Sequence, residues 1–214
     1  MDRFHRRLIE IGLSVAGEYG FALAGGYAVQ VYGIVDRPSE DVDLFGALEM
    51  DCPAAAARVA GAYRAAGLDT EVMQSTQRYV RLWISEPGAG RGCKVEVVAD
   101  VRFRPPVQMG LGPVLHPDDV AAGKTEALFS RAHARDFIDI DALLESGRYS
   151  REQLLQFGAR RDAGFDVETF AEMLSFVRRR SDAEFAAYGV DGPAAAGIRE
   201  RILAWADELR SRHS

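Results

Sequence analysis

The stretch that decides the fold covers residues 24–45 and reads AGGYAVQVYGIVDRPSEDVDLF. A short apolar run leads into its glycine pair, Gly25-Gly26, and residues 27–32 can continue as a helix. After a proline break, Asp41 and Asp43 alternate with apolar residues, as residues of a strand do, so both carboxylates lie on one face. The stretch therefore predicts a strand, a glycine turn, a helix and a second strand.

Each part of this pattern has a chemical use. A glycine pair between a strand and a helix lets the backbone approach a ligand closely, and its amides can bind phosphate. Asp41 and Asp43 can converge on a divalent ion, and Mg²⁺ prefers one or two carboxylates together with the phosphate oxygens of a substrate. Taken alone, each feature has an ordinary explanation as a turn or a solvated face. Their order and spacing favour phosphoryl chemistry.

The composition excludes several classes of protein. The chain has 214 residues, 48% hydrophobic and 27% charged, with a formal net charge of −6. This is typical of a globular protein of one large domain or two small ones. No apolar run approaches the roughly 20 residues of a membrane helix, and the first residues do not resemble a secretion signal, so we expect a cytoplasmic protein without membrane partners. Two cysteines and four histidines argue against a disulfide scaffold or a zinc cage.

The pattern along the chain predicts an α+β fold with two domains, an α+β core at residues 1–112 and a helical domain at residues 113–214. Hydrophobic periodicity and turn residues predict the elements of both. Strands are expected at residues 21–24, 41–45, 70–74, 79–85 and 93–101, the last two forming a hairpin. Helices are expected at residues 4–16, 27–32, 53–66, 117–130, 134–146, 151–160, 167–179 and 194–210.

A second group of charged residues opens the helical half. Lys124 and Arg131 lie two turns apart on one predicted helix, and Arg135 and Asp139 share a face of the next. Ion pairing along a helix explains both pairs. It does not explain a lysine at position 124 in a chain whose other basic residues, except Lys94, are all arginine. A clamp for a nucleoside triphosphate would explain it, because a lysine supplies a compact point charge.

Together these features resemble a known family. The order strand, Gly-Gly, helix and Ser-x-Asp-x-Asp strand is the core of the nucleotidyltransferase superfamily, and residues 24–45 resemble it closely. With Lys124 and the Arg-Asp-Phe-x-Asp sequence that begins at Arg135, the chain looks like the AbiEii/AbiGii family of nucleotidyltransferase toxins, whose mycobacterial members are called MenT. The resemblance covers about residues 20–145, and beyond them only a helical region is shared in kind.

The resemblance implies a nucleotidyltransferase-type mixed sheet with flanking helices, and it implies roles for particular residues. Asp41 and Asp43 would bind the catalytic Mg²⁺ or Mn²⁺, and Ser39 would lie beside the phosphates. Lys124 would contact the triphosphate, and Asp136 would complete the active site.

Two further points follow from the comparison with the superfamily. Many members have Gly-Ser where this chain has Gly25-Gly26, so backbone amides would replace a hydroxyl contact to phosphate. Members usually take a third metal carboxylate from a later strand, for which Glu96 and Asp100 are the candidates. Glu96 is favoured because it lies mid-strand among apolar neighbours, where an unpartnered carboxylate is costly. An outward-facing Glu96 on a half-exposed hairpin remains the alternative.

The expected reaction is attack by a hydroxyl on the α-phosphorus of a nucleoside triphosphate, with Lys124 and Arg131 meeting the triphosphate. Family resemblance favours the 3′ end of tRNA as acceptor and a partner antitoxin. Because the chain is acidic, a surface for RNA would have to be local. The candidates are Arg6-Arg7, Arg160-Arg161 and Arg178–Arg180, which are equally explained as solvated helix faces.

Three other functions remain open at this point. An aminoglycoside-type nucleotidyltransferase would suit an acidic chain, because its acceptor is a polycation. A non-catalytic binding partner is a second alternative, against which stands the combination of Asp41, Asp43 and Lys124. A protein kinase is the least favoured, because the sequence contains neither a GxGxxG loop nor a His-Arg-Asp triplet.

Overall fold

The computed structural model describes residues 1–212 and divides into two compact units. The first unit contains residues 1–31 and 39–119, and the second contains residues 32–38 and 120–214. The chain thus passes from the first unit into the second and back before it enters the second again. The sequence pattern predicts one boundary, after residue 112, whereas the first compact unit extends to residue 119 and lacks residues 32–38.

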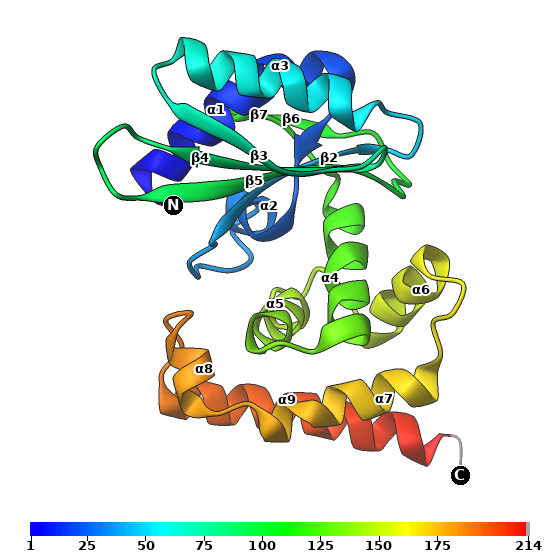
Figure 1. The fold of residues 1–214 in the computed structure, drawn as a ribbon. Coiled ribbons are helices and arrows are strands. Elements are labelled where there is room, and N and C mark those ends of the chain that lie inside the picture. Colours follow the sequence, from blue (N-terminus) through cyan, green and yellow to red (C-terminus); the bar gives the residue numbers. More distant parts are fainter. Residues whose placement is uncertain (213–214) are drawn as a thin grey trace. The chain divides into compact units, whose positions relative to one another are not determined.

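A mixed sheet of seven strands forms the centre of the first unit (Figure 1). Its strands are β1 (Ala22–Leu23), β2 (Asp41–Ala47), β3 (Asp69–Ser75), β4 (Tyr79–Ser85), β5 (Gly92–Asp100), β6 (Val107–Met109) and β7 (Gly112–Val114). They are ordered β3-β4-β5-β2-β1-β7-β6. β2 runs parallel to β5, and β1 runs parallel to β7, whereas the remaining neighbours are antiparallel. The predicted mixed sheet is confirmed, as is the hairpin of β4 and β5.

Two helices, α1 (Arg3–Ala16) and α3 (Cys52–Ala65), cover one face of this sheet (Figure 1). β2 and β5 alternate strictly between buried and half-exposed residues. Leu44, from the buried set of β2, would be 3.2 Å from a Cβ added at Gly12 of α1, so the buried set faces these helices. The two aspartates of β2 consequently lie on the opposite face. The short helix α2 (Gly25–Val31) follows β1 directly.

The second unit is helical. Its elements are α4 (Pro117–Arg131, from residue 120 onward), α5 (Ala134–Glu145), α6 (Arg151–Arg161), α7 (Val167–Ser175), a 3-10 turn at Phe176–Arg179, α8 (Asp182–Ala186) and α9 (Gly192–Ser211). They enclose a core that includes Phe137, Phe170 and Trp205, each at most 1% exposed. Ile34 and Val35 from the segment 32–38 pack against the same core. This explains why that segment belongs to the helical unit.

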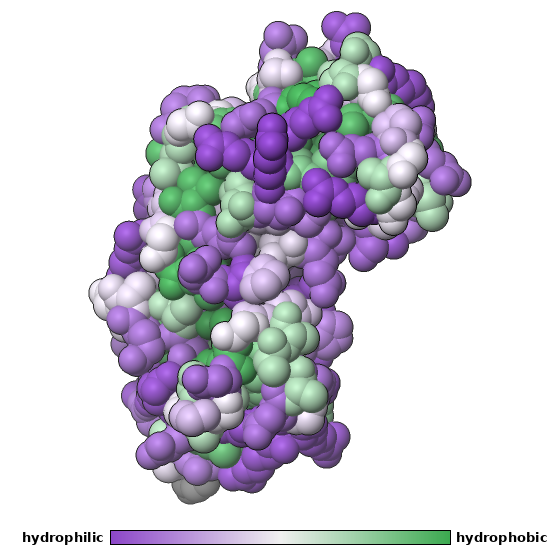
Figure 2. Space-filling model, turned by 90° about the vertical axis from the view of Figure 1, so that its left-hand side faces the viewer, coloured by the Kyte–Doolittle hydropathy of each residue, from purple (hydrophilic) through white to green (hydrophobic). Residues whose placement is uncertain are grey.

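The structure differs from the predicted elements in small ways. The segment after residue 104, expected to be a connection, contains β6 and β7, and the short helix α8 was not predicted. The expected helix at residues 167–179 changes to a 3-10 turn after Ser175. No helix within residues 1–212 is long and apolar enough to cross a membrane. On the face drawn in Figure 2, hydrophobic side chains reach the surface only in small areas.

Candidate functional site

The first part of the candidate site lies on the half-exposed face of β2 and β5. Parallel pairing sets Asp41 beside Lys94 and Asp43 beside Glu96, so these four charged residues occupy one face at neighbouring positions. All four are half-buried, between inward-facing valines, leucines and Cys93. The alternation of charged and apolar residues along both strands, which the sequence indicated, therefore places the four charged side chains on one face. Asp41 and Asp43, the predicted metal ligands, lie together as expected.

Gly25 fits closely against the carboxylate of Asp43. A Cβ at position 25 would lie 1.7 Å from Oδ2 of Asp43, and the backbone of Gly25 has a φ of +59°, which side-chain-bearing residues rarely adopt. The amide of Ala24 donates a hydrogen bond of 2.9 Å to the carbonyl of Asp43. The predicted glycine turn thus brings the start of α2 against the acidic strand. Gly26 follows in the first turn of α2 and is buried.

The oxygens of this pair suit a divalent cation. The Oδ1 atom of Asp41 is buried and accepts no hydrogen bond from the described residues, although the Nζ atom of Lys94 lies 3.2 Å away. A buried carboxylate oxygen without a hydrogen bond is costly, and a metal ion would satisfy it. Two carboxylates on one strand face are also a sufficient protein contribution for Mg²⁺, which takes its other ligands from phosphates and water. The residues therefore fit the metal that the family implies.

Glu96 has other partners in the structure. Its Oε1 atom accepts hydrogen bonds of 2.9 Å from the hydroxyl of Tyr79 and from Nε of Arg81, both on β4. Burial and the bond to this carboxylate raise the pKa of Tyr79 to about 12. Among residues 1–212, no three His, Cys, Asp or Glu side chains converge as a metal-binding group. The role of Glu96 as third ligand stays a prediction. The alternative, Asp100, accepts a bond of 2.7 Å from the amide of Val101.

Ser39, the predicted neighbour of the phosphates, begins the return of the chain to the first unit. Its Oγ donates a long bond of 3.4 Å to the carbonyl of Asp41. The carbonyl of Ser39 accepts a bond of 3.1 Å from the hydroxyl of Tyr27 on α2, which also contacts Nδ1 of His5 on α1. Burial lowers the pKa of His5. These contacts hold the residues that precede Asp41 against α1 and α2.

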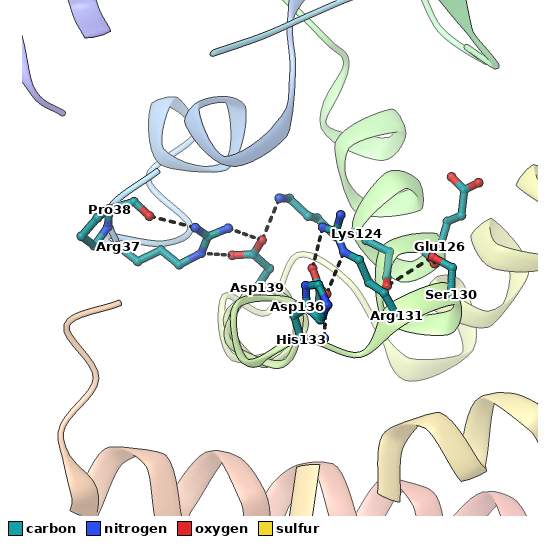
Figure 3. Close-up of polar contacts among 10 residues, drawn as sticks. Arg37, Pro38, Lys124, Glu126, Ser130, Arg131, His133, Asp136 and Asp139 are labelled. Atoms are coloured by element: carbon teal, nitrogen blue, oxygen red, sulfur yellow. Dashed lines mark hydrogen bonds and ion pairs between the residues drawn. The ribbon is translucent and has the colours of Figure 1, made fainter. Parts of the chain in front are cut away.

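The second group of predicted site residues lies in the helical unit (Figure 3). Nζ of Lys124 on α4 lies 2.7 Å from Oδ2 of Asp139 on α5. Arg37 approaches the same carboxylate from the segment 32–38, with Nε and one terminal nitrogen each 2.6 Å from an oxygen. The side chains of Asp139, Arg37 and Lys124 are 0%, 4% and 10% exposed. One buried carboxylate thus binds two cations.

The electrostatics of this cluster follow from its burial. Burial by itself would raise the pKa of Asp139, but the charges of Lys124 and Arg37 and their hydrogen bonds outweigh it, so the pKa is lowered. The guanidinium of Arg37 also lies over the ring of Tyr188, 5.5 Å from its centroid. With one negative and two positive charges, the cluster has an excess of one positive charge.

Arg131 and Asp136, the other predicted residues of this unit, bind each other (Figure 3). Nε and one terminal nitrogen of Arg131 lie 3.0 Å and 2.9 Å from the two carboxylate oxygens of Asp136. Asp136 also accepts a bond of 2.9 Å from the amide of His133, which precedes α5. These contacts give Asp136, whose side chain is fully buried, a structural task at the start of the helix. Its proposed catalytic role and the nucleotide contact of Arg131 stay predictions.

Three of the five arginines considered for RNA in the helical unit contact neighbouring side chains. The side chain of Arg161 is 5% exposed and pairs with Glu126. Arg180 pairs with Glu184 at 3.0 Å, and Arg179 lies over the ring of Phe176. An RNA-binding role for Arg160-Arg161 or Arg178–Arg180 stays a prediction.

Three residues of these clusters were not identified from the sequence as site residues. Lys94 is one of only two lysines in the chain, which is the sequence signal that also singled out Lys124. In the structure each lysine pairs with an aspartate, Asp41 or Asp139. Asp139 was expected to pair with Arg135 along the helix. Its pairing with Arg37 joins residues 102 positions apart, for which the sequence contains no local signal.

Comparisons with known proteins identify the family of the chain. The family model described as "Nucleotidyl transferase AbiEii toxin, Type IV TA system" matches residues 13–207. The sequence matches none of the curated proteins significantly.

Three solved structures show a similar fold. A candidate nucleotidyltransferase from H. pylori is 15% identical, with a TM-score of 0.58 over 96% of this chain and 92% of that one. JHP933 from Helicobacter pylori is 18% identical, with a TM-score of 0.50 over 97% and 94%. MenT4, a nucleotidyltransferase toxin from Mycobacterium tuberculosis H37Rv, is 17% identical, with a TM-score of 0.58 over 95% and 83%.

The structural similarity shows the fold, and the family model shows the family. A type IV toxin of this class implies a nucleoside triphosphate as substrate and an antitoxin as partner. The chain is a nucleotidyltransferase that belongs to the AbiEii toxin family of type IV toxin–antitoxin systems.

Proposed function

We propose that the protein transfers a nucleoside monophosphate from a nucleoside triphosphate to the 3′ end of tRNA, with Mg²⁺ or Mn²⁺ held by Asp41 and Asp43. The observation that carries the proposal is the fit of Gly25 against the carboxylate of Asp43, beside the buried Oδ1 of Asp41, which accepts no hydrogen bond from residues 1–212 and lies 3.2 Å from Nζ of Lys94. A backbone without a side chain at this point leaves room for the carboxylate of Asp43 against the start of α2. Action in the cytoplasm is proposed because both substrates are found there.

In the proposed reaction, the terminal hydroxyl oxygen of the tRNA forms a bond to the α-phosphorus. The bond from the α-phosphorus to the bridging oxygen breaks, the hydroxyl loses its proton, and pyrophosphate leaves. Such transfers require positioning and charge neutralisation more than covalent chemistry from the protein. The metal ion, when bound, neutralises developing negative charge on the phosphate oxygens. Asp41 and Asp43 would hold the ion on the strand face.

Lys124 is proposed to contact the triphosphate, as the family resemblance implies. Its ion pair with Asp139 supports a fixed position of the ammonium group, because the buried carboxylate and its second partner, Arg37, restrict the side chain. The excess positive charge of this cluster favours an anionic ligand.

The test is transfer of label from each α-labelled nucleoside triphosphate in turn to total tRNA, in the presence of Mg²⁺. Asp41→Asn and Asp43→Asn remove the charge of one carboxylate and keep its shape, and both should reduce transfer at least 100-fold. Asp69→Asn, an exposed aspartate at the start of β3, is the matched control and should retain activity.

An aminoglycoside panel is tested in parallel. Label that enters tRNA only with active protein supports the proposal. Label that enters the drugs instead would assign the protein to small-molecule modification. Full activity of Asp41→Asn or Asp43→Asn would refute the metal assignment.

A further inference from the structure

A pocket of about 420 Å³ lies on the first unit, and none of the predicted metal- or nucleotide-binding residues lines it. Arg3 and Arg7, from the first two turns of α1, line one side of it. Glu86 and Arg91, from the loop between β4 and β5, line the other side. Phe4, whose side chain is buried, lies at its base beneath the guanidinium of Arg91, which is 5.0 Å from the ring centroid.

The positive charges of this pocket exceed the negative ones. Three arginines line it with a single carboxylate, in a chain whose net charge is −6. The ion pairs are loose: Arg7 and Arg91 lie 3.7 Å and 3.4 Å from oxygens of Glu86, and Arg91 lies 3.9 Å from Asp2. By contrast, Arg37 binds Asp139 at 2.6 Å. Exposed pairs of this length contribute little to stability, so the guanidinium groups can bind an anion at little cost.

The pocket lies at the same end of the sheet as Asp41. β2 and β5 run parallel with Asp41 beside Lys94, and Arg91 precedes Lys94 by three residues, roughly 10 Å along an extended chain. On the α1 side, His5 contacts Tyr27, which binds the carbonyl of Ser39 just before Asp41. The pocket therefore lies at the end of the sheet where the acidic strand begins, on the side of α1, whereas Asp41 and Asp43 face the other side of the sheet.

We propose that Arg3, Arg7 and Arg91 bind phosphates in the backbone of the acceptor RNA. This inference rests on the proposed function, because an RNA whose terminal hydroxyl is at Asp41 and Asp43 must extend away from that point along the protein. The pocket supplies the local basic surface that an acidic chain needs for RNA.

The test measures binding of fluorescein-labelled tRNA and of a short labelled single-stranded RNA as a function of salt. Arg3→Gln, Arg7→Gln and Arg91→Gln are combined in one variant. The control combines Arg58→Gln, Arg64→Gln and Arg148→Gln, which are exposed elsewhere and change the net charge equally. We expect affinity for both RNAs to fall at least 10-fold in the pocket variant only. The slope of log affinity against log salt should decrease by about two, at roughly 0.7 for each phosphate that is no longer neutralised.

Glu86→Gln should change the affinity for RNA in the opposite direction. Removal of the one carboxylate that lines the pocket should strengthen RNA binding and leave the fold intact, because its ion pairs are long and partly exposed. The triple variant could lose stability, because Arg7 also donates a hydrogen bond to the carbonyl of Ala66. Glu86→Gln and the double variant Arg3→Gln/Arg91→Gln keep this bond, so they test the proposal even if the triple variant does not fold.

Transfer activity and the KM for the nucleoside triphosphate are measured on the same proteins. An equal loss of RNA binding in both triple variants, or an unchanged salt slope, would overturn the proposal. So would a rise in the nucleotide KM without loss of RNA binding, because the pocket would then bind the triphosphate. If the wild type transfers label to tRNA but the pocket variant binds RNA as tightly as the wild type, the RNA-binding role of the pocket is refuted and the proposed function stands. Wild-type protein that binds RNA but transfers nothing to it refutes the proposed function instead.

Discussion

Asp139 on α5 binds Lys124 on α4 at 2.7 Å while it also accepts two bonds from Arg37. Its side chain is completely buried, so water does not replace a missing partner. Ion pairs at this depth do not by themselves add much stability, because desolvation costs offset the attraction. Once formed, however, they are costly to break, because an uncompensated charge is left inside. The cluster therefore fixes Lys124 and ties the segment 32–38 to the helices.

Asp139→Asn should destabilise the protein by roughly 3–5 kcal/mol, because Arg37 and Lys124 would keep their charges without a counterion. Urea denaturation followed by circular dichroism measures the free energy of unfolding. Asp162→Asn is a suitable control, because this aspartate is half-buried after α6 and binds only local backbone. A change below 1 kcal/mol in Asp139→Asn would mean that the two cations find other partners.

The same cluster predicts a dependence of stability on pH. The pKa of Asp139 is lowered from its ordinary value of 3.8 in the folded protein. Its contribution to stability is therefore complete above pH 3.8 and is lost as the pH falls from there through the lower folded-state pKa. The stability difference between wild type and Asp139→Asn should accordingly be constant from pH 7 to about pH 5 and narrow below about pH 4. A difference that stays unchanged down to pH 3 would contradict this assignment.

Gly25→Ala should abolish transfer. The added Cβ would lie 1.7 Å from Oδ2 of Asp43, so the carboxylate must move, and the φ of +59° adds strain. Gly33→Ala is the matched control, because its φ is +67° but nothing lies within 4 Å of the added Cβ. The control should lose only about 1 kcal/mol of stability and keep its activity. Equal activity losses in the two variants would show that backbone strain, and not the displaced carboxylate, is responsible.

Much of the fold follows from local sequence patterns. The strict alternation of Asp41, Val42, Asp43 and Leu44 predicted β2, and the same period predicted β5. β6 and β7 were missed because each has three residues, too few to show a period, and they lie among glycines and a proline. The longer helices of the second unit were predictable because their caps and apolar periods agree, whereas α8, with five residues, is too short to show a period.

The candidate site was predictable only where its residues are neighbours in sequence. The aspartates of β2 were found because their spacing on one strand fixes their shared face. The pairing of Asp41 with Lys94 depends on the register of two parallel strands, and the contact of Arg37 with Asp139 depends on tertiary packing. Neither can be derived from periodicity. The proximity of Arg91 and Arg7 in the basic pocket likewise depends on tertiary packing and cannot be derived from periodicity.

Register favours Glu96 over Asp100 as the third metal carboxylate. Glu96 pairs with Asp43, whereas Asp100 pairs with Ala47, four residues and roughly 13 Å further along the strand. Glu96→Gln should therefore lower transfer and raise the Mg²⁺ concentration needed for half-maximal activity, whereas Asp100→Asn should do neither.

Arg81→Gln separates metal binding from the ion pair of Glu96 with Arg81. It removes the guanidinium that now binds Glu96 and leaves the carboxylate in place, so the Mg²⁺ requirement should not rise. Magnesium titrations of the transfer rate compare the three variants at fixed ionic strength. If Arg81→Gln raises the Mg²⁺ requirement as much as Glu96→Gln does, the ion pair between Arg81 and Glu96 is what matters for metal binding. Glu96 is then not a metal ligand. If Asp100→Asn alone raises the requirement, the metal lies further along β5 than the register indicates.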